Sequence, residues 1–536
     1  MSRREKAAKE QRADERARKR GERRASRKNC RYLAWNHLTR NQKEVAQRIM
    51  AGDYRMIGPA GWGFLDKFVI FLKTIGFLEC LDVAGEGYVR RMITIAKLLL
   101  TYQIKILMGI GSMNQVPQLL FGDIGLLMML GYTAEQIKNG HCNRGKGKKN
   151  GPMHKDTLAD SLDRFSPVEI EHILNSGVKL LAKKGFIKDS TYLMDATDLP
   201  TTEKCRGAGR RTVTKKVVGR DKETGEKRIV EVLETTHGFK LHILRGLDSR
   251  IVVAAKVTQI QESEKNWTIP LIHQATENLG GRKIRLLLID RGYIDGLTLW
   301  TLKYELGIDW IIPVRTDMAV TKDARGLRET NDPKRIFRAQ RDGLKVMGLK
   351  DLRSYDQYGD AAHQQKNAQA KDFKANPVNA VMVTHWGTKE YPPGKEKVFL
   401  TSLPVSDPLK IIDKYDLRSL IENTAFRELK QGWLINKIPK KTDRAVTAHA
   451  LLTLCMYNFT NAYRTEQGQE LTEQGIRRFR LQTFSQTYAK IVALSDEHFG
   501  IFDMEEFAIL LGKPPKHLRP WSDVDPEAFK KEHGIE

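Results

Sequence analysis

The sequence predicts an α/β protein whose mixed five-stranded sheet is interrupted by a β-rich insertion, with an all-α region before it and a helical region after it. Three observations support this. Apolar residues recur at helical spacing from about residue 64 to 131. From residue 192 to 314 the pattern changes to short apolar or alternating runs, which are typical of strands. A helical stretch at 264–279 separates two of these runs, as a crossover between parallel strands requires.

The chain before the sheet divides into an arm and a helical region. Residues 1–30 hold 13 Lys or Arg and 5 Asp or Glu, a local net charge of +8, with almost nothing to bury. We expect this arm to be disordered or transiently helical when free, serving either as a solubilising tail or as a phosphate-binding arm. Residues 31–187 are predicted to be a helical region, with a glycine- and lysine-rich linker at about 140–151.

The core follows in two parts. Three antiparallel strands, a crossover helix and a parallel fourth strand are the opening of a ribonuclease-H-like domain, in which acids lie at the ends of strands one and four. Residues 315–395 are polar and irregular with one clear strand, so we predict an insertion there. The expected strands are 192–195, 238–243, 250–257, 284–289, 309–314, 380–384 and 397–401, the core parts are 188–314 and 396–465, and 466–536 is expected to be a C-terminal helical region and tail.

Composition points to a polyanionic partner. The 536 residues include 91 Lys+Arg and 65 Asp+Glu, a net charge of +26, which favours nucleic acid over an anionic membrane surface. The apolar run 92–100 is interrupted by Lys97 and is too short to span a membrane. Five cysteines without a CxxC pair argue against a disulfide framework and a zinc ribbon. Without a secretory signal in the first 29 residues, we expect a cytoplasmic, nucleoid-associated protein.

Three acids form the candidate catalytic set. Asp195 ends the first strand, Asp290 follows a largely apolar strand, and Glu422 shares one helical face with Tyr415 and Arg418. Carboxylates suit Mg²⁺, and two divalent ions can neutralise the attacking and leaving oxygens of a phosphodiester. Each acid alone also fits a turn, a cap or a solvated ion pair.

These segments resemble the DDE transposases of the insertion-sequence-four type over about residues 190–465. Leu193-Met-Asp195-Ala-Thr197 is similar to the motif of the first acid and Asp290-Arg-Gly-Tyr293 to that of the second. The segment from Tyr415 to Lys430 resembles the family signature of Tyr, two residues, Arg, three residues, Glu, six residues and Lys. The resemblance implies a ribonuclease-H-like core with a β-rich insertion between the fifth strand and the catalytic helix.

The function implied by the resemblance is cut-and-paste transposition. The N-terminal region would bind the terminal inverted repeats of a mobile element, and the protein would cleave and transfer its strands in a synaptic homodimer. Asp195, Asp290 and Glu422 would hold two Mg²⁺ or Mn²⁺ ions, while Tyr415, Arg418 and Lys430 would contact phosphates. Two alternatives stay open: a domesticated, non-catalytic DNA-binding protein, and a ribonuclease-H-like nuclease without strand transfer. The glycine-rich segments lack the context of a nucleotide-binding fingerprint, so no nucleotide cofactor is expected.

One departure from the family signature concerns its lysine. The signature lysine falls at position 429, which is Leu429 here, and Lys430 is one residue late. A one-residue π-bulge in the helix would return Lys430 to the face of Glu422. A continuous α-helix from Tyr415 to Lys430 would count against this hypothesis.

A basic segment between the first two expected strands is the last candidate. Residues 204–220 are long for such a connection and contain no acid. We predict a DNA-contacting loop in which Arg210, Arg211, Lys215 and Lys216 bind phosphate, against the alternative of a solvated loop. His237 and His242 flank the neighbouring strand, where packed or hydrogen-bonded histidines are more common than ligands.

Overall fold

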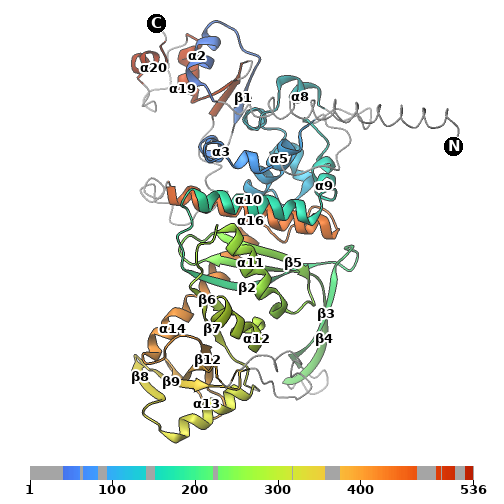
Figure 1. The fold of residues 1–536 in the computed structure, drawn as a ribbon. Coiled ribbons are helices and arrows are strands. Elements are labelled where there is room, and N and C mark those ends of the chain that lie inside the picture. The colour runs from blue at the N-terminus through green and yellow to red at the C-terminus, as the bar shows by residue number, and fades with distance from the viewer. Residues whose placement is uncertain are drawn as a thin grey trace, which may run out of the picture. The chain divides into compact units, whose positions relative to one another are not determined.

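The computed structural model describes residues 40–60, 64–81, 93–140, 151–220, 227–316, 318–355, 373, 375–466, 490–495, 498–512 and 525–534. The chain divides into two compact units (Figure 1). Unit 1 combines Met1–Ile173 with Leu471–Glu536, and unit 2 is Leu174–Glu470. The predicted arm at 1–30 and nearly all of the predicted linker at 140–151 lie outside the described residues.

Unit 1 contains a small sheet built from both ends of the chain. Strand β1 (Met56–Ala60) pairs antiparallel with β13 (Lys490–Leu494), which pairs with β14 (Phe499–Phe502). Helices α2 and α19 pack on this sheet around the buried Phe502, and α20 packs on these two helices. The helices are α2 Gln42–Met50, α3 Phe64–Ile75, α4 Phe77–Cys80, α5 Ile95–Leu107, η2 Met113–Gln115, α6 Val116–Leu119, α7 Ile124–Met129, α8 Ala134–Asn139, α9 Lys155–Leu162, α19 Met504–Leu510 and α20 Pro526–His533, and α10 Pro167–Lys183 crosses into unit 2.

This arrangement differs from the prediction at both ends of the chain. The N-terminal region is not all-α, because it contains β1, and the C-terminal region contributes two strands to the same unit instead of forming a helical region of its own. The sequence of β1 is Met-Ile-Gly-Pro-Ala, in which glycine and proline both weaken a strand prediction. Its pairing with a strand near the opposite end of the chain supplies the hydrogen bonds that define it.

Unit 2 contains an eleven-stranded mixed sheet, which confirms the mixed α/β class. The predicted strands of the first core part lie in the spatial order β5-β4-β2-β6-β7. Strand β2 (Thr191–Thr201) is antiparallel to β4 (Lys227–Gly246) and parallel to β6 (Leu286–Ile289). Strand β5 (Val252–Gln259) is antiparallel to β4, and β7 (Asp309–Pro313) is parallel to β6.

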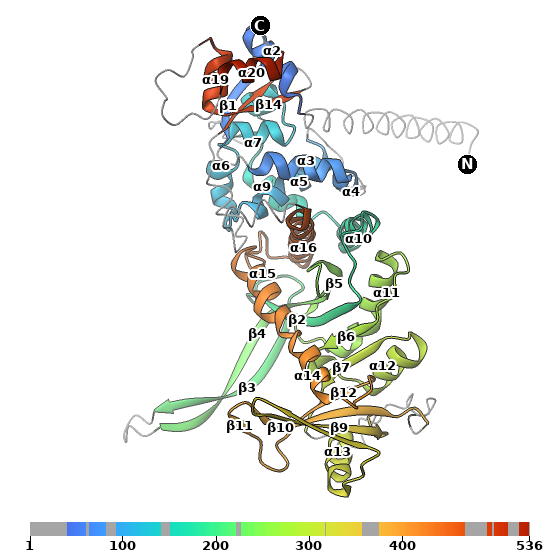
Figure 2. The ribbon, with the colours of Figure 1, turned by 90° about the vertical axis from the view of Figure 1, so that its left-hand side faces the viewer.

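Helices cover the core sheet where the apolar patterns predict them. The run Leu-Leu-Leu-Ile of β6 is buried throughout, as a central parallel strand requires. Helix α11 (Thr268–Asn278) packs on β5 and β4, and follows the short η3 turn (Glu264–Trp267). Helix α16 (Asp443–Glu466) lies beside α10, with Gly177 close to Phe459 and Cys455 (Figures 1 and 2).

The remaining strands extend the sheet beyond β7. Strand β12 pairs antiparallel with β7, and β10, β9 and β8 follow in order, so the insertion is part of the same sheet. Residues 356–372 of the insertion lie outside the described residues. The remaining elements are η4 Arg291–Tyr293, α12 Gly296–Trp300, η5 Thr301–Glu305, α13 Ala319–Thr330, β8 Ile336–Arg341, β9 Leu344–Leu352, β10 Val378–Trp386, β11 Lys389–Glu390, β12 Lys397–Thr401, α14 Pro408–Asp416, η8 Ile421–Phe426 and α15 Arg427–Gln431.

A long hairpin replaces the predicted basic loop. Residues 209–220 form β3, which pairs with residues 227–238 of β4 and extends away from the core sheet (Figure 2). The loop prediction was therefore wrong for most of the segment. Its β-branched residues, including Thr212, Val213 and Thr214, favour a strand, and β4 supplies the pairing partner.

No helix in the described parts of unit 1 and unit 2 has both the length and the apolar composition needed to cross a bilayer.

Candidate active site

Asp195 and Asp290 lie side by side because their strands are neighbours in parallel register. The pairing runs from Thr191 with Leu286 to Met194 with Ile289, so each acid is the next residue along its strand. The backbone N of Asp290 donates to Met194 O at 3.2 Å, which extends the pairing to the acids themselves. Asp195 is buried within β2, whereas Asp290 follows β6 and accepts a hydrogen bond from Gly292 N at 3.1 Å.

Arg418 brings the third acid to the other two. Its Nη2 donates to Glu422 Oε1 at 2.8 Å, one helical turn away along the chain. Its Nη1 lies 2.8 Å from Asp195 Oδ2 and 3.3 Å from Asp290 Oδ1. The three acids predicted from the sequence therefore converge on a single guanidinium, although they lie far apart in the chain.

Burial and neighbouring charges shift the pKa of Asp195 in this cluster. Burial, followed by the nearby carboxylate of Asp290, raises the pKa of Asp195 to about 7. The guanidinium of Arg418 lowers this pKa, but by less than burial and Asp290 together raise it. Asp195 is thus close to half-protonated near neutral pH, and gains its full charge when the positive charge around it increases.

Tyr415 lies against the same cluster from α14. Its hydroxyl is 3.5 Å from Ile289 O, and its ring packs on Phe399 of β12 with the ring centroids 4.8 Å apart. The Arg418 guanidinium carbon lies 5.8 Å from the centre of the Tyr415 ring. Tyr415 thus supports Arg418 and the end of β6, while Phe399 is fully buried in the core.

The helix that carries Glu422 is not a continuous α-helix. Helix α14 ends at Asp416, and η8, from Ile421 to Phe426, is a π-helix that precedes α15. A π-helical segment therefore precedes Lys430, as the hypothesis of a π-bulge requires. Leu429 is fully buried, whereas Lys430 is partly exposed, and no hydrogen bond or ion pair joins the Lys430 side chain to another described residue.

The three carboxylates suit a divalent cation in charge and in donor type. Oxygen ligands are the ones that Mg²⁺ prefers, and the three acids already attract the positive charge of Arg418. In their present positions, no group of three His, Cys, Asp or Glu side chains in the described ranges is spaced to hold a metal ion. The acids can close around such an ion only if Arg418 withdraws from the point where they meet.

A cavity of about 410 Å³ opens beside Asp290 and Arg418. Tyr415 and Arg418 line one side of it, and Lys395 and Lys397 approach from the start of β12. Lys397 also lies 5.3 Å from the ring centre of Trp386 and 5.1 Å from that of Phe399. The lining of the cavity thus includes the cationic side chains of Arg291, Lys395, Lys397 and Arg418 and the rings of Tyr391 and Tyr415.

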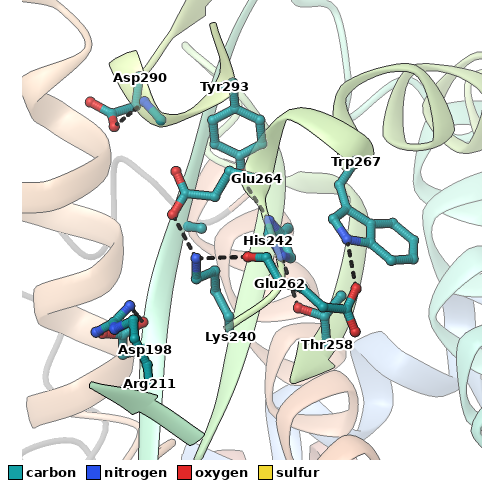
Figure 3. A network of polar contacts seen from close by, with 12 residues as sticks. Asp198, Arg211, Lys240, His242, Thr258, Glu262, Glu264, Trp267, Asp290 and Tyr293 are labelled. Carbon is teal, nitrogen blue, oxygen red and sulfur yellow. Dashed lines mark hydrogen bonds and ion pairs between the residues drawn. The ribbon is translucent and has the colours of Figure 1, made fainter. Parts of the chain in front are cut away.

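The structure places the four predicted basic residues on the β3–β4 hairpin. Arg210 is exposed, while Arg211 is ion-paired with Asp198, with Nη1 3.3 Å from Oδ1 (Figure 3). Lys215 is ion-paired with Glu234 across the hairpin. Lys216 lies opposite Glu231 in the pairing, and its side chain is outside the described part of the structure. Of the three described side chains, none forms a hydrogen bond or ion pair with an acid of the cluster.

A second polar network lies beside the acids, and most of its members could not be identified from the sequence. Lys240 Nζ donates to Glu264 Oε1 at 2.9 Å, and His242 bonds both the Tyr293 hydroxyl and the Thr258 hydroxyl (Figure 3). His242 is fully buried and hydrogen-bonded, as predicted for it. Glu264 was missed because it opens a helix, where an acid is usually explained by the helix dipole.

Comparisons with known proteins give one family. The model of the family described as "Transposase DDE domain" matches residues 187–459, just over half of the chain and the part that carries all three acids. No curated protein matches. The solved structures include a piggyBac transposase synaptic complex with hairpin DNA, with 9% identity, 90% of this chain and 87% of that chain covered, and a TM-score of 0.37, which is too low to establish a common fold. On the strength of the family match, the chain belongs to the DDE-domain transposases.

Proposed function

We propose that this transposase cleaves DNA at the ends of a mobile element and joins the freed strand to a target, using Asp195, Asp290 and Glu422 as its catalytic carboxylates. The observation that carries the proposal is the convergence of these acids on Arg418, from two parallel strands and a helix. A surface ion pair would involve one acid and one base, and would not collect three acids from distant parts of the chain around one cation.

The strand order supports a ribonuclease-H-like core. The first three strands are antiparallel, the fourth and fifth run parallel to the first, and acids lie on the first strand and after the fourth. The β-rich insertion lies between the fifth strand and the helix of Glu422, and a π-helix precedes Lys430, as a shift of this lysine toward the signature position would require. These features favour the insertion-sequence-four type with its Tyr-Arg-Glu-Lys signature.

The three carboxylates would hold two Mg²⁺ or Mn²⁺ ions, which neutralise the attacking and leaving oxygens and activate the attacking water. The sheet already holds Asp195 and Asp290 next to each other, as binding of the same ions would require. Arg418 would leave the acids and bind a phosphate of the element end, because its planar fork matches phosphate geometry. Tyr415 limits the positions open to Arg418, and Lys430 supplies a further phosphate contact from α15.

The other parts of the chain would contribute DNA contacts. We propose that the arm at 1–30 and the helical region of 31–187 bind the inverted repeats, and that the β3–β4 hairpin contacts the duplex through Arg210 and its neighbours. Residues 204–220 hold seven Lys or Arg and no acid, which supports an interaction with phosphate. Cleaving two element ends together needs two active sites, so the working form would be a homodimer on DNA at the nucleoid.

A cleavage assay tests the proposal. Labelled duplexes from the DNA on either side of the gene would be incubated with Mg²⁺ and either the wild type or the Asp195→Ala, Asp290→Ala or Glu422→Ala variant. Each variant should lower the cleavage rate by roughly a thousandfold or more, because the acids act as a unit. Asp248→Ala, an exposed acid of the β4–β5 turn, is the matched control.

Three outcomes would change the assignment. A variant that cuts at the wild-type rate removes that residue from the catalytic set. Cleavage without joined product would favour a nuclease, and DNA binding without cleavage would favour the non-catalytic alternative. All three acids are present and close together, which argues against that last possibility.

A further inference from the structure

The turn that carries Asp290 is held from the face of the sheet opposite Asp195. In the pairing of β2 with β4, Asp195 lies opposite Ile243, whereas His242 lies opposite Ala196 and Lys240 opposite Asp198. Successive side chains in a strand point to opposite faces. His242 and Lys240 therefore project from the face that Asp195 does not use, toward η3 and the turn after Asp290 (Figure 3).

Glu264 lies directly against this turn. A Cβ built on Gly292 would be 1.7 Å from Glu264 Oε2 and 3.6 Å from Asp290 Oδ2, so two carboxylates flank the same glycine. The other oxygen, Glu264 Oε1, accepts a hydrogen bond from Lys240 Nζ at 2.9 Å. Lys240 also donates to Glu262 O at 3.1 Å and is itself buried, so its position is restricted.

The next residue of the turn is held by a directional chain of hydrogen bonds. Thr258 Oγ1 donates to Gln259 O at 3.3 Å, so it accepts from His242 Nε2 at 3.0 Å. His242 Nδ1 must then accept from the Tyr293 hydroxyl, 2.9 Å away. Burial and the charge of Lys240 lower the pKa of His242 to about 3, which keeps the ring neutral and this order of donors intact.

We propose that Glu264 is a positioning residue, which sets the place of Asp290 by its contact with Gly292 while Lys240 holds it there. This inference rests on the proposed catalytic role of Asp290. The turn is also held by the Asp290 N–H to Met194 O, by the Gly292 N–H to Asp290 Oδ2 and by the Tyr293 hydroxyl, and Glu264 adds a contact at the glycine itself. Because a misplacement of about 1 Å can lower a rate by about a hundredfold, holding this glycine bears directly on cleavage.

The contact with Glu264 explains why position 292 is a glycine. Gly292 does not have a left-handed backbone conformation, so alanine there meets no backbone strain. The added methyl group would meet Glu264 instead, and would push its carboxylate away from Lys240. Gly292→Ala and Glu264→Ala should therefore damage the same contact by two routes.

A double-mutant cycle tests the proposal on the full-length protein, well below its melting temperature. Glu264→Ala and Gly292→Ala should each lower the single-turnover cleavage rate by at least about tenfold. The double variant should cleave at the rate of Glu264→Ala alone rather than at the product of the two losses. Lys240→Met should behave like Glu264→Ala, and Glu277→Ala, which removes an exposed acid of α11, should cleave like the wild type.

A second measurement separates positioning from a general loss of structure. The affinity for the uncut duplex without divalent ions should change by less than about twofold in every variant, since the turn would act on the rate and not on DNA binding. Parallel thermal unfolding of the four members of the cycle should show the same non-additivity in Tm, independently of any activity.

Two results would overturn the inference. Wild-type cleavage by Glu264→Ala would show that Glu264 does not position Asp290, and losses that multiply in the double variant would show that Glu264 and Gly292 act independently. Failure of the proposed function is a different result: Asp290→Ala would still cleave, while the unfolding cycle would continue to report the contact.

Discussion

Arg418 Nη1 lies 2.8 Å from Asp195 Oδ2, and the same nitrogen is 3.3 Å from Asp290 Oδ1. The guanidinium therefore occupies the position where two carboxylates of neighbouring parallel strands meet. A cation in this position offsets the repulsion between acids that the sheet register forces together. It also means that the acids cannot bind another cation between them until Arg418 moves.

Replacing Arg418 should strengthen metal binding while weakening catalysis. In Arg418→Ala, the affinity for Mg²⁺ or Mn²⁺ without DNA should rise by about tenfold or more, because the ions no longer compete with a guanidinium. Cleavage should fall, since the phosphate contact is lost. Isothermal titration calorimetry measures the first effect. Arg427→Ala, whose side chain bonds Gln431 on the same helix, is the control. Equal metal affinity in wild type and Arg418→Ala would contradict the proposal that Arg418 and the metal ions compete for the same carboxylates.

The stability of the metal-free protein should depend on pH through Asp195. Its pKa is raised from 3.8 to about 7 in the folded state, so the folded protein binds this proton more tightly than the unfolded chain. The stability that Asp195 contributes is complete below pH 3.8 and is lost as the pH rises to about 7, by about 1.4 kcal/mol per pH unit. Metal binding needs the ionised form and should strengthen over the same range.

Urea unfolding of the wild type and Asp195→Asn between pH 4.5 and 7.5 measures this effect. The difference in unfolding free energy between the two proteins should narrow or reverse in favour of Asp195→Asn as the pH rises, and should level off above about 7. Parallel curves across the whole range would show that the pKa of Asp195 is not raised.

The one-residue displacement of the signature lysine can be tested by two adjacent substitutions. Lys430→Ala should weaken binding to an element-end duplex and reduce the slope of log K against log salt by about 0.9, as expected for one lost phosphate contact. Leu429→Ala should instead lower the unfolding free energy by about 2–5 kcal/mol, because Leu429 is fully buried. Lys430→Arg should retain the salt slope. An unchanged slope in Lys430→Ala would remove Lys430 from the DNA contacts.

Two neighbouring arginines of the hairpin should respond differently. Arg210→Ala should weaken DNA binding and reduce the salt slope by about 0.9 without affecting stability, because Arg210 is exposed. Arg211→Ala should also lower Tm, because it leaves Asp198 without its ion-pair partner. Filter binding at several salt concentrations, together with thermal unfolding, separates the two effects. Unchanged binding in both variants would exclude this end of the hairpin as a DNA contact.

The small sheet of unit 1 should depend on residues from the C-terminal segment. Phe502→Ala should cost about 3–5 kcal/mol, because the side chain is fully buried beside Val45 and Ile49. Hydrogen exchange should then show faster amide exchange in α2, although α2 lies at the other end of the chain. Phe507→Ala, at a partly buried position of the same cluster, should have a smaller effect. Unchanged protection of α2 would contradict this packing.

Much of the core was predictable because its signals are local. The runs of β6, β7 and β12 are apolar over a few residues, and their strands were placed to within two residues at each end. The π-helix was predicted because one helical face had to carry both Glu422 and a lysine that is one residue late. Strand β3 was missed because its basic residues suggested a solvated loop, although its valines and threonines favoured a strand.

Glu264 and β1 could not be found in the same way. The significance of Glu264 depends on its distance to Gly292, which lies on a different element. Strand β1 depends on hydrogen bonds to β13, and the residue pattern of Met56–Ala60 does not predict them. Both follow from contacts between segments that only the folded chain brings together.

The α/β class, the order of the core strands, and the choice of the three acids and of the arginine beside the third as candidate site residues could all be predicted from the sequence alone. These are properties of residue type and short-range spacing, which act within one strand or one helical turn. Only the folded structure shows that Asp195, Asp290 and Glu422 share one guanidinium, that Gly292 contacts Glu264, and that segments from the two ends of the chain form one sheet. Those relationships depend on strand register and packing, which bring together residues that the linear order separates.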